Sequence, residues 1–235
     1  MIDLNCDLGE GLQNEHLLMP LISSCNISCG AHAGSIEIID KVIQLALQHQ
    51  VKIGAHPSFP DKENFGREIM EISNTDLEES LVNQLTLFKE RAALQKATVH
   101  HVKPHGALYN LIAVNEETAI VVVKAIQTVF QQIKLYAPYN SVIEKVAQEN
   151  NIEIIYEAFA DRNYNDDLTL VSRVYPYATI TDKVKVLEHI KRMVETSEVK
   201  TVQDNKIFIQ ATTFCVHGDN KHALEILAYL NENLE

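Results

Sequence analysis

The side chains best suited to chemistry occur in six short clusters, and each cluster also contains glycine, proline or another small residue. The clusters bring together carboxylates, imidazoles, a lysine and arginines, which are groups that transfer protons, bind metal ions or hold anionic substrates. A set drawn from several parts of the chain favours hydrolysis by general acid–base chemistry or with the help of a metal ion. The candidates are Asp7, Asn26, His32, His56, Arg67, Lys103, His105, Asp161, Arg162, His217 and Asp219.

Acids and bases that move protons form the first group of candidates. Asp7 comes after an apolar run, where a carboxylate is desolvated and well placed to act as a base; the alternative is a cap on the following turn. Two prolines stiffen the loop that follows His56. Because side chains alternate along a strand, Lys103 is expected to point into the interior of a barrel. A lysine is costly to bury there unless it meets a carboxylate or a substrate. The catalytic candidates are Asp7, His56, Lys103, His105 and Asp161.

The second group of candidates is suited to binding a substrate. Arg67 can hold a carboxylate through two parallel hydrogen bonds. Gly30 and Gly34, on either side of His32, allow the backbone to approach a ligand closely. The structural alternatives are a histidine bonded within its own loop, a surface arginine, and a helix cap for Asp219. The binding candidates are Asn26, His32, Arg67, Arg162, His217 and Asp219.

A metal ion is a further hypothesis for the same clusters. Asp7, His32 and His56 supply one carboxylate and two imidazoles. These ligands suit zinc or a similar divalent ion. The alternative is a metal-free site in which the same groups handle protons.

Short apolar runs alternate with longer amphipathic stretches along the chain, which is typical of parallel strands joined by helices. The expected strands are Met1–Asn5, Ser23–Ile27, Val51–Ala55, Thr98–Lys103, Lys134–Ala137, Ile152–Ala158 and Ile207–Phe214. The expected helices are Ile36–His49, Thr75–Lys96, Glu116–Gln131, Ser141–Glu149, Asp182–Glu195 and Lys221–Leu230, with Ser73 or Thr75 as a cap of the long one.

The position of the polar clusters decides between a barrel and an open sheet. The clusters follow six of the expected strands. In a barrel all strand ends meet at one face, whereas an open sheet gathers only the loops at its switch point. The sequence therefore predicts an α/β fold with an irregular barrel of about seven strands, built as a single domain over residues 1–235.

Composition narrows the class of protein. The net charge of −12 repels phosphate backbones, so nucleic acid is not an expected partner. No apolar run reaches the roughly 18 residues of a membrane span, and the first residues lack the pattern of a secretory signal. Four cysteines without a disulfide pattern are expected as reduced thiols. We therefore expect a cytoplasmic protein without a membrane partner.

Several established catalytic motifs are absent from the sequence. There is no Gly-x-Ser-x-Gly elbow of a serine hydrolase and no His-Glu-x-x-His helix of a zinc protease. None of the eight glycines belongs to a GxxxxGK[ST] loop, which cradles the phosphates of ATP.

Six ordered motifs give the chain a resemblance to a known family. DLNCDLGEG, NISCGAHAG, GAHPSFPDKENFGR, HVKPHGALYN, EAFADRNY and VHGDN resemble the LamB/YcsF family from Asp3 to about Asn220. The resemblance implies an irregular seven-stranded barrel of the glycoside hydrolase/deacetylase type. One departure is Ser172, where the family usually carries proline, and the segment Ser172–Tyr177 is expected to differ in shape.

The resemblance also implies a reaction. The chain is expected to act with subunits B and C of a 5-oxoprolinase, opening the lactam of 5-oxoproline to glutamate at the expense of ATP and two water molecules. Because this sequence lacks a phosphate-binding loop, ATP is expected on the partner subunits. Two alternatives stay open: a metal-dependent deacetylase or amidohydrolase that acts alone, and a non-catalytic subunit that binds the substrate. Assembly into a homo-oligomer is also left open.

The first prediction concerns the isolated chain. We expect it neither to hydrolyse ATP nor to open 5-oxoproline, because it lacks a phosphate loop and because a five-membered lactam is a stable amide. Phosphate release and glutamate formation should appear only when both partner subunits are added. ATP-dependent glutamate formation by the purified chain, free of contaminating partners, would contradict this prediction.

Overall fold

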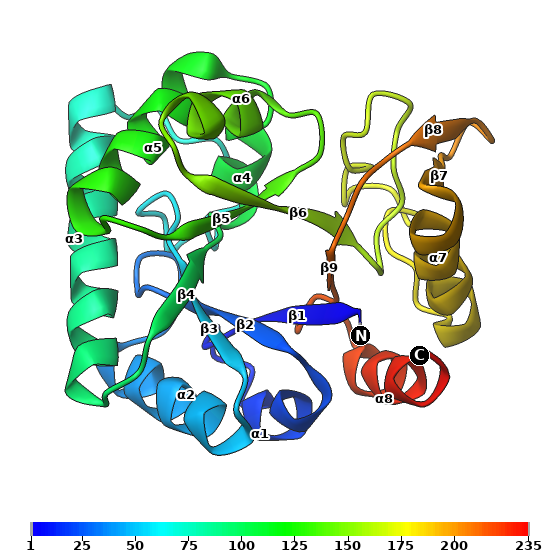
Figure 1. Cartoon of the computed structure of the whole chain (residues 1–235), viewed down its shortest axis with the longest axis horizontal. Helices are drawn as coiled ribbons and strands as arrows, with labels where there is room; N and C mark the ends of the chain where they lie inside the picture. The colour runs from blue at the N-terminus through cyan, green and yellow to red at the C-terminus, as the bar shows by residue number, and fades with distance from the viewer. Residues whose placement is uncertain (1, 235) are drawn as a thin grey trace.

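Seven parallel strands close into a barrel in the order β1-β2-β3-β4-β5-β6-β9, as Figure 1 shows in a computed structural model that describes residues 2–234. The predicted irregular seven-stranded barrel is therefore confirmed. Only a short strand closes the barrel: β9 has three residues and pairs with both β6 and β1. The barrel strands are β1 (Asp3–Leu8), β2 (Ser24–Ser28), β3 (Lys52–His56), β4 (Val99–Val102), β5 (Lys134–Pro138), β6 (Glu153–Phe159) and β9 (Thr213–Cys215).

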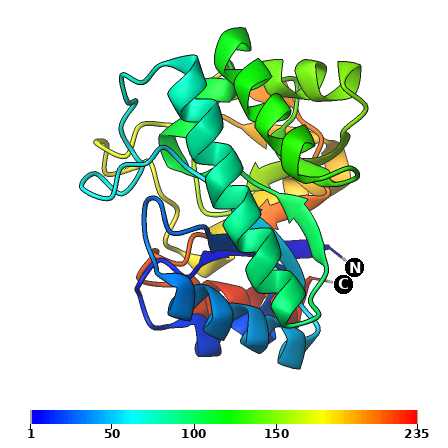
Figure 2. The same ribbon diagram turned by 90° about the vertical axis from the view of Figure 1, so that its left-hand side faces the viewer.

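Helices cover the outside of the barrel. The longest, α3, runs across one side of it and packs against α5 (Figure 2). Most of the long helices begin at a residue whose side chain accepts a hydrogen bond from the first turn; for α3 this residue is Ser73, as predicted. The helices are α1 (Glu15–Leu18), the 3-10 turn η1 (Met19–Leu21), α2 (Ile36–His49), α3 (Asn74–Leu94), α4 (Gly106–Ile112), α5 (Glu116–Val129), α6 (Val142–Glu149), α7 (Lys183–Thr196) and α8 (Ala223–Asn233).

Two of the predicted strands differ from the structure by more than one residue at an end. The first continues to Leu8, so Asp7 lies within β1, where it pairs in register with Asn26 of β2; Met1 lies outside the described residues. The strand predicted at Ile207–Phe214 is wrong as a single element. Its first part belongs to β8 (Lys206–Phe208), which pairs antiparallel with β7 (Glu198–Lys200) outside the barrel, and only β9 enters the barrel. An apolar run does not reveal which partner each of its residues pairs with.

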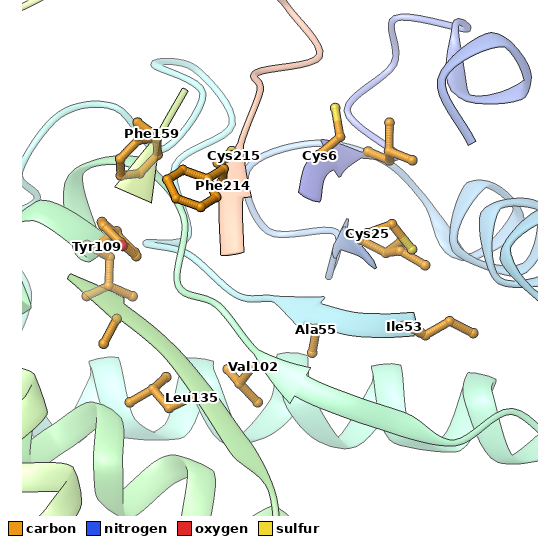
Figure 3. Packing of buried hydrophobic residues seen from close by; sticks show 14 of the residues in the cluster. Cys6, Cys25, Ile53, Ala55, Val102, Tyr109, Leu135, Phe159, Phe214 and Cys215 are labelled. Carbon is orange, nitrogen blue, oxygen red and sulfur yellow. The ribbon is translucent and has the colours of Figure 1, made fainter. Parts of the chain in front are cut away.

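The outward faces of the barrel strands form the apolar core. Alternate residues such as Cys25, Ile53, Val102, Leu135 and Phe214 are buried between the strands and the helices (Figure 3). All four cysteines are buried and free. The core is therefore a ring around the barrel rather than a plug inside it.

The inside of the barrel is polar and is connected by hydrogen bonds. At the amino-terminal ends of the strands, Ser24 and Thr213 each donate to Oδ1 of Asp3 at 2.7 Å. One layer higher, Asn5 donates to the Thr213 hydroxyl at 2.8 Å and accepts from Asn26 at 2.8 Å. A buried polar group is tolerated only when it is hydrogen-bonded, so each layer supports the next toward the mouth.

His101 is a fully buried polar side chain inside the barrel. Its ring stacks on Tyr136 with centroids 3.7 Å apart, and its Nε2 donates to Oδ1 of Asn26 at 2.6 Å. Burial lowers the pKa of His101 well below its ordinary value, so the ring is neutral. His101 therefore has a structural role inside the barrel.

Among the described residues, no single helix is long and apolar enough to cross a membrane.

Gly54 provides a test of the packing inside the barrel. A Cβ atom added at this position would lie 2.1 Å from Nε2 of His101. We expect Gly54→Ala to lower the free energy of unfolding by about 1–3 kcal/mol, because the ring must move out of its stack. Urea unfolding followed by circular dichroism would measure the loss.

The control is the same substitution in a His101→Ala background. There the alanine should cost little, because the ring that it would strike is gone. An equal cost in both backgrounds would show that the clash is not the cause.

Candidate active site

A cavity of about 540 Å³ opens at the carboxyl ends of the barrel strands. Most of the predicted site residues line it, as expected for a barrel of this kind. Asn26, His32 and Asp161 do not; they lie behind residues that do, so direct substrate contact by Asn26 and His32 is not supported. The predicted residues that line the cavity are Asp7, His56, Arg67, Lys103, His105, Arg162, His217 and Asp219.

Lys103 lies at the floor of this cavity and is 2% exposed. Its ammonium is 2.9 Å from Oδ1 of Asp7 and 2.8 Å from Oε1 of Glu157, and it also donates to Sγ of Cys215 at 3.2 Å. The expectation that a buried lysine meets a carboxylate is confirmed, with two carboxylates instead of one.

Aromatic rings form the wall beside this ammonium. Lys103 Nζ lies 5.3 Å from the ring centre of Phe159 and 5.9 Å from that of Tyr109, and the two rings meet edge to face (Figure 3). Burial, and then the charge of Glu157, raise the pKa of Tyr109 well above its ordinary value, so its hydroxyl keeps its proton. The floor therefore offers the phenol of Tyr109 as a hydrogen-bond donor, beside the positive charge of Lys103.

Opposite charges hold these buried groups in their ionised forms. Burial alone would raise the pKa of Asp7, but the charge of Lys103 outweighs it and holds that pKa well below the usual value. Burial alone would lower the pKa of Lys103, but the Asp7 carboxylate outweighs it and raises that pKa well above the usual value. Asp7 thus stabilises the fold above its unfolded pKa of about 3.9, and this contribution is lost as the pH falls below that value.

Asn26 fixes the position of the Asp7 carboxylate from beneath. Its Nδ2 donates at 2.8 Å to Oδ1 of Asp7 and at 2.8 Å to Oδ1 of Asn5, while its own oxygen is occupied by His101. Asn26 is fully buried. Its role is to position Asp7, rather than to bind a substrate.

An aspartate and a histidine form a dyad on the other side of the cavity. Asp161, which is fully buried after β6, accepts from Nδ1 of His217 at 2.7 Å and from Asn220 at 2.9 Å. The His217 ring is stacked on Phe159 with centroids 5.2 Å apart. Because Asp161 occupies Nδ1, the Nε2 lone pair of neutral His217 is left to accept a proton, as a general base requires.

Two arginines rim the cavity and share one carboxylate. Arg67 and Arg173 both bind Oδ2 of Asp219, the latter at 3.0 Å, and all three side chains are partly exposed. Asp219 therefore bridges the arginines instead of capping the last helix. Two guanidinium groups on one oxygen form a site that a substrate carboxylate can share or take over.

Arg162 lines the cavity but is held by hydrogen bonds within the protein. Its guanidinium is buried and donates to the carbonyl oxygens of Ala178 at 3.2 Å and Val171 at 2.7 Å. Its side chain thus ties the long loop between β6 and α7 to the barrel, although it still lines the cavity. The shape expected for Ser172–Tyr177 from the family departure stays a prediction.

Three histidines and Glu10 form a cluster at the remaining edge of the cavity. Oε1 of Glu10 lies 3.2 Å from Nε2 of His32, 3.3 Å from Nδ1 of His105 and 3.9 Å from Nε2 of His56. Burial lowers the pKa of His32 and, further, that of His105, so both rings are held neutral. The structure thus joins His32 and His56 to Glu10 and His105.

Glu10, Glu157 and Tyr109 are functional residues that sequence reasoning did not select. Glu157 lies on β6 and is 2% exposed. The alternation of side chains along a strand could have revealed it. Glu157 lies two residues before Phe159 on β6, so the two side chains point to the same face of the strand. Glu10 follows a left-handed Gly9, and its neighbours come from loops far along the chain, which no local pattern reveals.

A closed parallel barrel with an acid–base dyad, a buried lysine and an arginine-rimmed cavity defines the class: a β/α-barrel protein built for hydrolysis. The model of the LamB/YcsF family matches residues 2–235. This chain belongs to the LamB/YcsF family.

Relatives of known name cover nearly the whole chain. The sequence is 38% identical to the A subunit of a 5-oxoprolinase from Bacillus cytotoxicus, over 95% of this chain and 91% of that protein. It is 37% identical to the protein of the same name from Haemophilus influenzae, over 100% of this chain and 96% of that protein.

Solved structures agree with this result. A lactam utilization protein from Thermus thermophilus superposes with a TM-score of 0.90 at 30% identity, covering 98% of this chain and 96% of that one. A β-1,4-mannanase of glycoside hydrolase family 113 has a TM-score of 0.53 at 10% identity over 98% of each chain, which shows a shared barrel fold alone.

Lys103 provides a test of the buried charges. We expect Lys103→Met to lower the free energy of unfolding by about 3–5 kcal/mol at neutral pH, because Asp7 and Glu157 lose their shared cation in a buried place. The matched control is Lys134→Met, which removes a surface pair with Glu153 and should cost about 1 kcal/mol or less. Urea unfolding of both variants gives the comparison, and similar small losses would contradict the charge argument.

Proposed function

We propose that this chain is the A subunit of a 5-oxoprolinase, which opens the lactam of 5-oxoproline to glutamate together with subunits B and C in the cytoplasm. The observation that carries the proposal is the Asp161–His217 dyad facing the same cavity as Arg67 and Arg173. The names of the full-length relatives support the choice of a lactam as substrate.

The rim gives the substrate its orientation. 5-Oxoproline carries one carboxylate, and Arg67 and Arg173 already hold a carboxylate, that of Asp219. A substrate carboxylate placed between these guanidinium groups directs the lactam ring into the cavity. The lactam carbonyl then faces the Tyr109 hydroxyl and the Lys103 ammonium at the floor, so a hydrogen bond from the first and the positive charge of the second stabilise negative charge on its oxygen.

The dyad moves the proton. Nε2 of His217 takes a proton from water as the water oxygen forms a bond to the carbonyl carbon. The carbon–nitrogen bond of the ring then breaks, and His217 returns the proton to the leaving nitrogen. Asp161 keeps the ring in the correct tautomer and stabilises its charged form in between.

ATP belongs to the partner subunits in this proposal. The sequence has no phosphate loop, and the carboxylates Asp7, Glu10 and Glu157 that line the cavity repel a polyanion. The partners therefore supply the energy, either by passing on an activated intermediate or by docking to complete the site. A non-catalytic binding subunit would not need a dyad aimed into the cavity.

The proposal predicts a loss of chemistry when the dyad is broken. We expect His217→Asn to lower kcat for glutamate release by about 10²–10⁴-fold in the reconstituted three-subunit complex, because the proton acceptor is removed. Asp161→Asn should show a loss of the same kind, because the tautomer is no longer fixed. Single-turnover glutamate assays with ATP and 5-oxoproline would measure both.

The matched control is His222→Asn, which replaces a more exposed histidine whose ring pairs with Glu225. It should keep the activity of the unchanged protein. Full activity of His217→Asn would refute the dyad, and glutamate release without ATP or partners would favour an amidohydrolase that acts alone.

A further inference from the structure

The histidine cluster at the cavity edge contains more electron-pair donors than protons to share. Glu10, His32, His56 and His105 are 9%, 2%, 1% and 5% exposed, so water cannot compensate for a mismatch between them. The proposed lactam chemistry uses none of these four side chains.

Two of the histidines have their protons fixed by backbone carbonyls. Nδ1 of His56 lies 2.6 Å from the carbonyl oxygen of Lys103, and Nε2 of His105 lies 2.9 Å from that of Phe65. A carbonyl oxygen only accepts, so each of these nitrogens must carry the hydrogen. In the neutral rings, Nε2 of His56 and Nδ1 of His105 are therefore lone pairs.

These two lone pairs face each other at 2.9 Å. Oε1 of Glu10 completes a triangle with them, 3.3 Å from His105 Nδ1 and 3.9 Å from His56 Nε2. Three electron-rich atoms in a buried place repel one another unless a positive charge lies between them. Metal–nitrogen bonds of about 2.0–2.1 Å place the ligands of a tetrahedral ion about 3.3 Å apart, and the three distances lie on either side of that value.

We propose that Glu10, His56 and His105 bind one divalent transition-metal ion of the zinc type. Two imidazoles and one carboxylate favour zinc, and its neighbours in the first transition row, over magnesium or calcium, which prefer oxygen ligands. All three residues line the cavity. The remaining coordination position is therefore open to water or a ligand from that side.

His32 is not a ligand in this site, although it is close. Its ring is stacked on that of His105, with centroids 3.8 Å apart and planes within 2° of parallel. An imidazole binds a metal within the plane of its ring, and one ion cannot lie in two parallel, stacked planes. Nδ1 of His32 lies 2.9 Å from the hydroxyl of Ser58, which donates to the carbonyl oxygen of Phe59, and Nε2 of His32 lies 3.2 Å from Oε1 of Glu10.

The surroundings of the ligands are fixed as a metal site requires. Phe65 has a left-handed backbone, with φ of 57°, which aims its carbonyl at His105, and its ring meets His32 and His105 edge-on at 5.5 Å. Hydrogen bonds to the second nitrogen of a ligating histidine fix its tautomer and orientation. His56 and His105 both have such a bond to a carbonyl oxygen.

This ligand set replaces the one expected from the sequence, Asp7, His32 and His56. Asp7 Oδ2 is 3.5 Å from His56 Nε2, but the Asp7 carboxylate is held by Lys103 at 2.9 Å and Asn26 at 2.8 Å. A cation already neutralises Asp7, whereas Glu10 has three imidazoles and no lysine or arginine within 4 Å among the described residues.

Metal content is the direct test. The full chain, purified without chelator, should contain about one zinc, manganese, iron, cobalt, nickel or copper ion per chain by mass spectrometry. After treatment with chelator, Co²⁺ should be taken up with the visible absorption bands of a tetrahedral or five-coordinate site. Chelation should also lower the melting temperature of the unchanged protein, because the electron pairs are again left unbalanced.

Variants locate the ion. Glu10→Gln and His105→Gln should abolish Co²⁺ uptake, and their melting temperature should no longer respond to chelator. His32→Asn should weaken Co²⁺ binding by about 10–100-fold without abolishing it. His100→Gln is the control, because this half-buried histidine on β4 contacts His101 and not the cluster, and it should bind as the unchanged protein does.

A protein without a metal ion would give a different set of results. Protein that contains no metal and takes up neither Co²⁺ nor Zn²⁺ at micromolar concentrations would overturn the proposal. A shared proton between His56 and His105 would then hold the pair, visible as a strongly downfield ring proton in the NMR spectrum. These variants do not change the Asp161–His217 dyad. The absence of a metal ion would therefore not contradict the lactam proposal, which the dyad variants test separately.

Discussion

The buried ammonium of Lys103 is the interaction on which the site depends. It lies at the end of the barrel interior and neutralises carboxylates from two different strands, Asp7 of β1 and Glu157 of β6. An ion pair in such a place is costly to desolvate, so its geometry must be held closely. The hydrogen-bonded layers beneath it, from Asp3 through Asn5 and Asn26, provide that support.

A polar barrel interior has a consequence for the fold as a whole. The apolar contacts that stabilise most domains are displaced to the outside of the strands, where the helices pack. The interior is instead specified by directed hydrogen bonds, which accept few substitutions because a replaced side chain leaves a buried partner without its hydrogen bond. Gly54 shows how tightly the interior is packed, because a methyl group added at this position would clash with the His101 ring.

The lysine also separates two groups of side chains with different chemistry. On one side, Asp161 and His217 form a pair suited to moving a proton. On the other, His56 and His105 are committed to backbone carbonyls and face Glu10 with lone pairs. Both groups open on one cavity, so a ligand held by the arginine rim lies within reach of each.

The strand–helix alternation, the gathering of polar side chains at one end of a parallel barrel and the inward direction of Lys103 could all be predicted from the sequence. These follow from local rules: the period of two in a strand, the capping of helices, and the fact that parallel strands end on one face. Which charges meet could not be predicted in this way. Asp7 and Lys103 are 96 residues apart in the chain, and their contact depends on the register of four strands. The same reason explains why Glu10 and Glu157 escaped the sequence-based selection, and why Ile207–Phe214 resembles one strand: pairing partners are chosen by packing across the folded molecule, which leaves no local trace in the sequence.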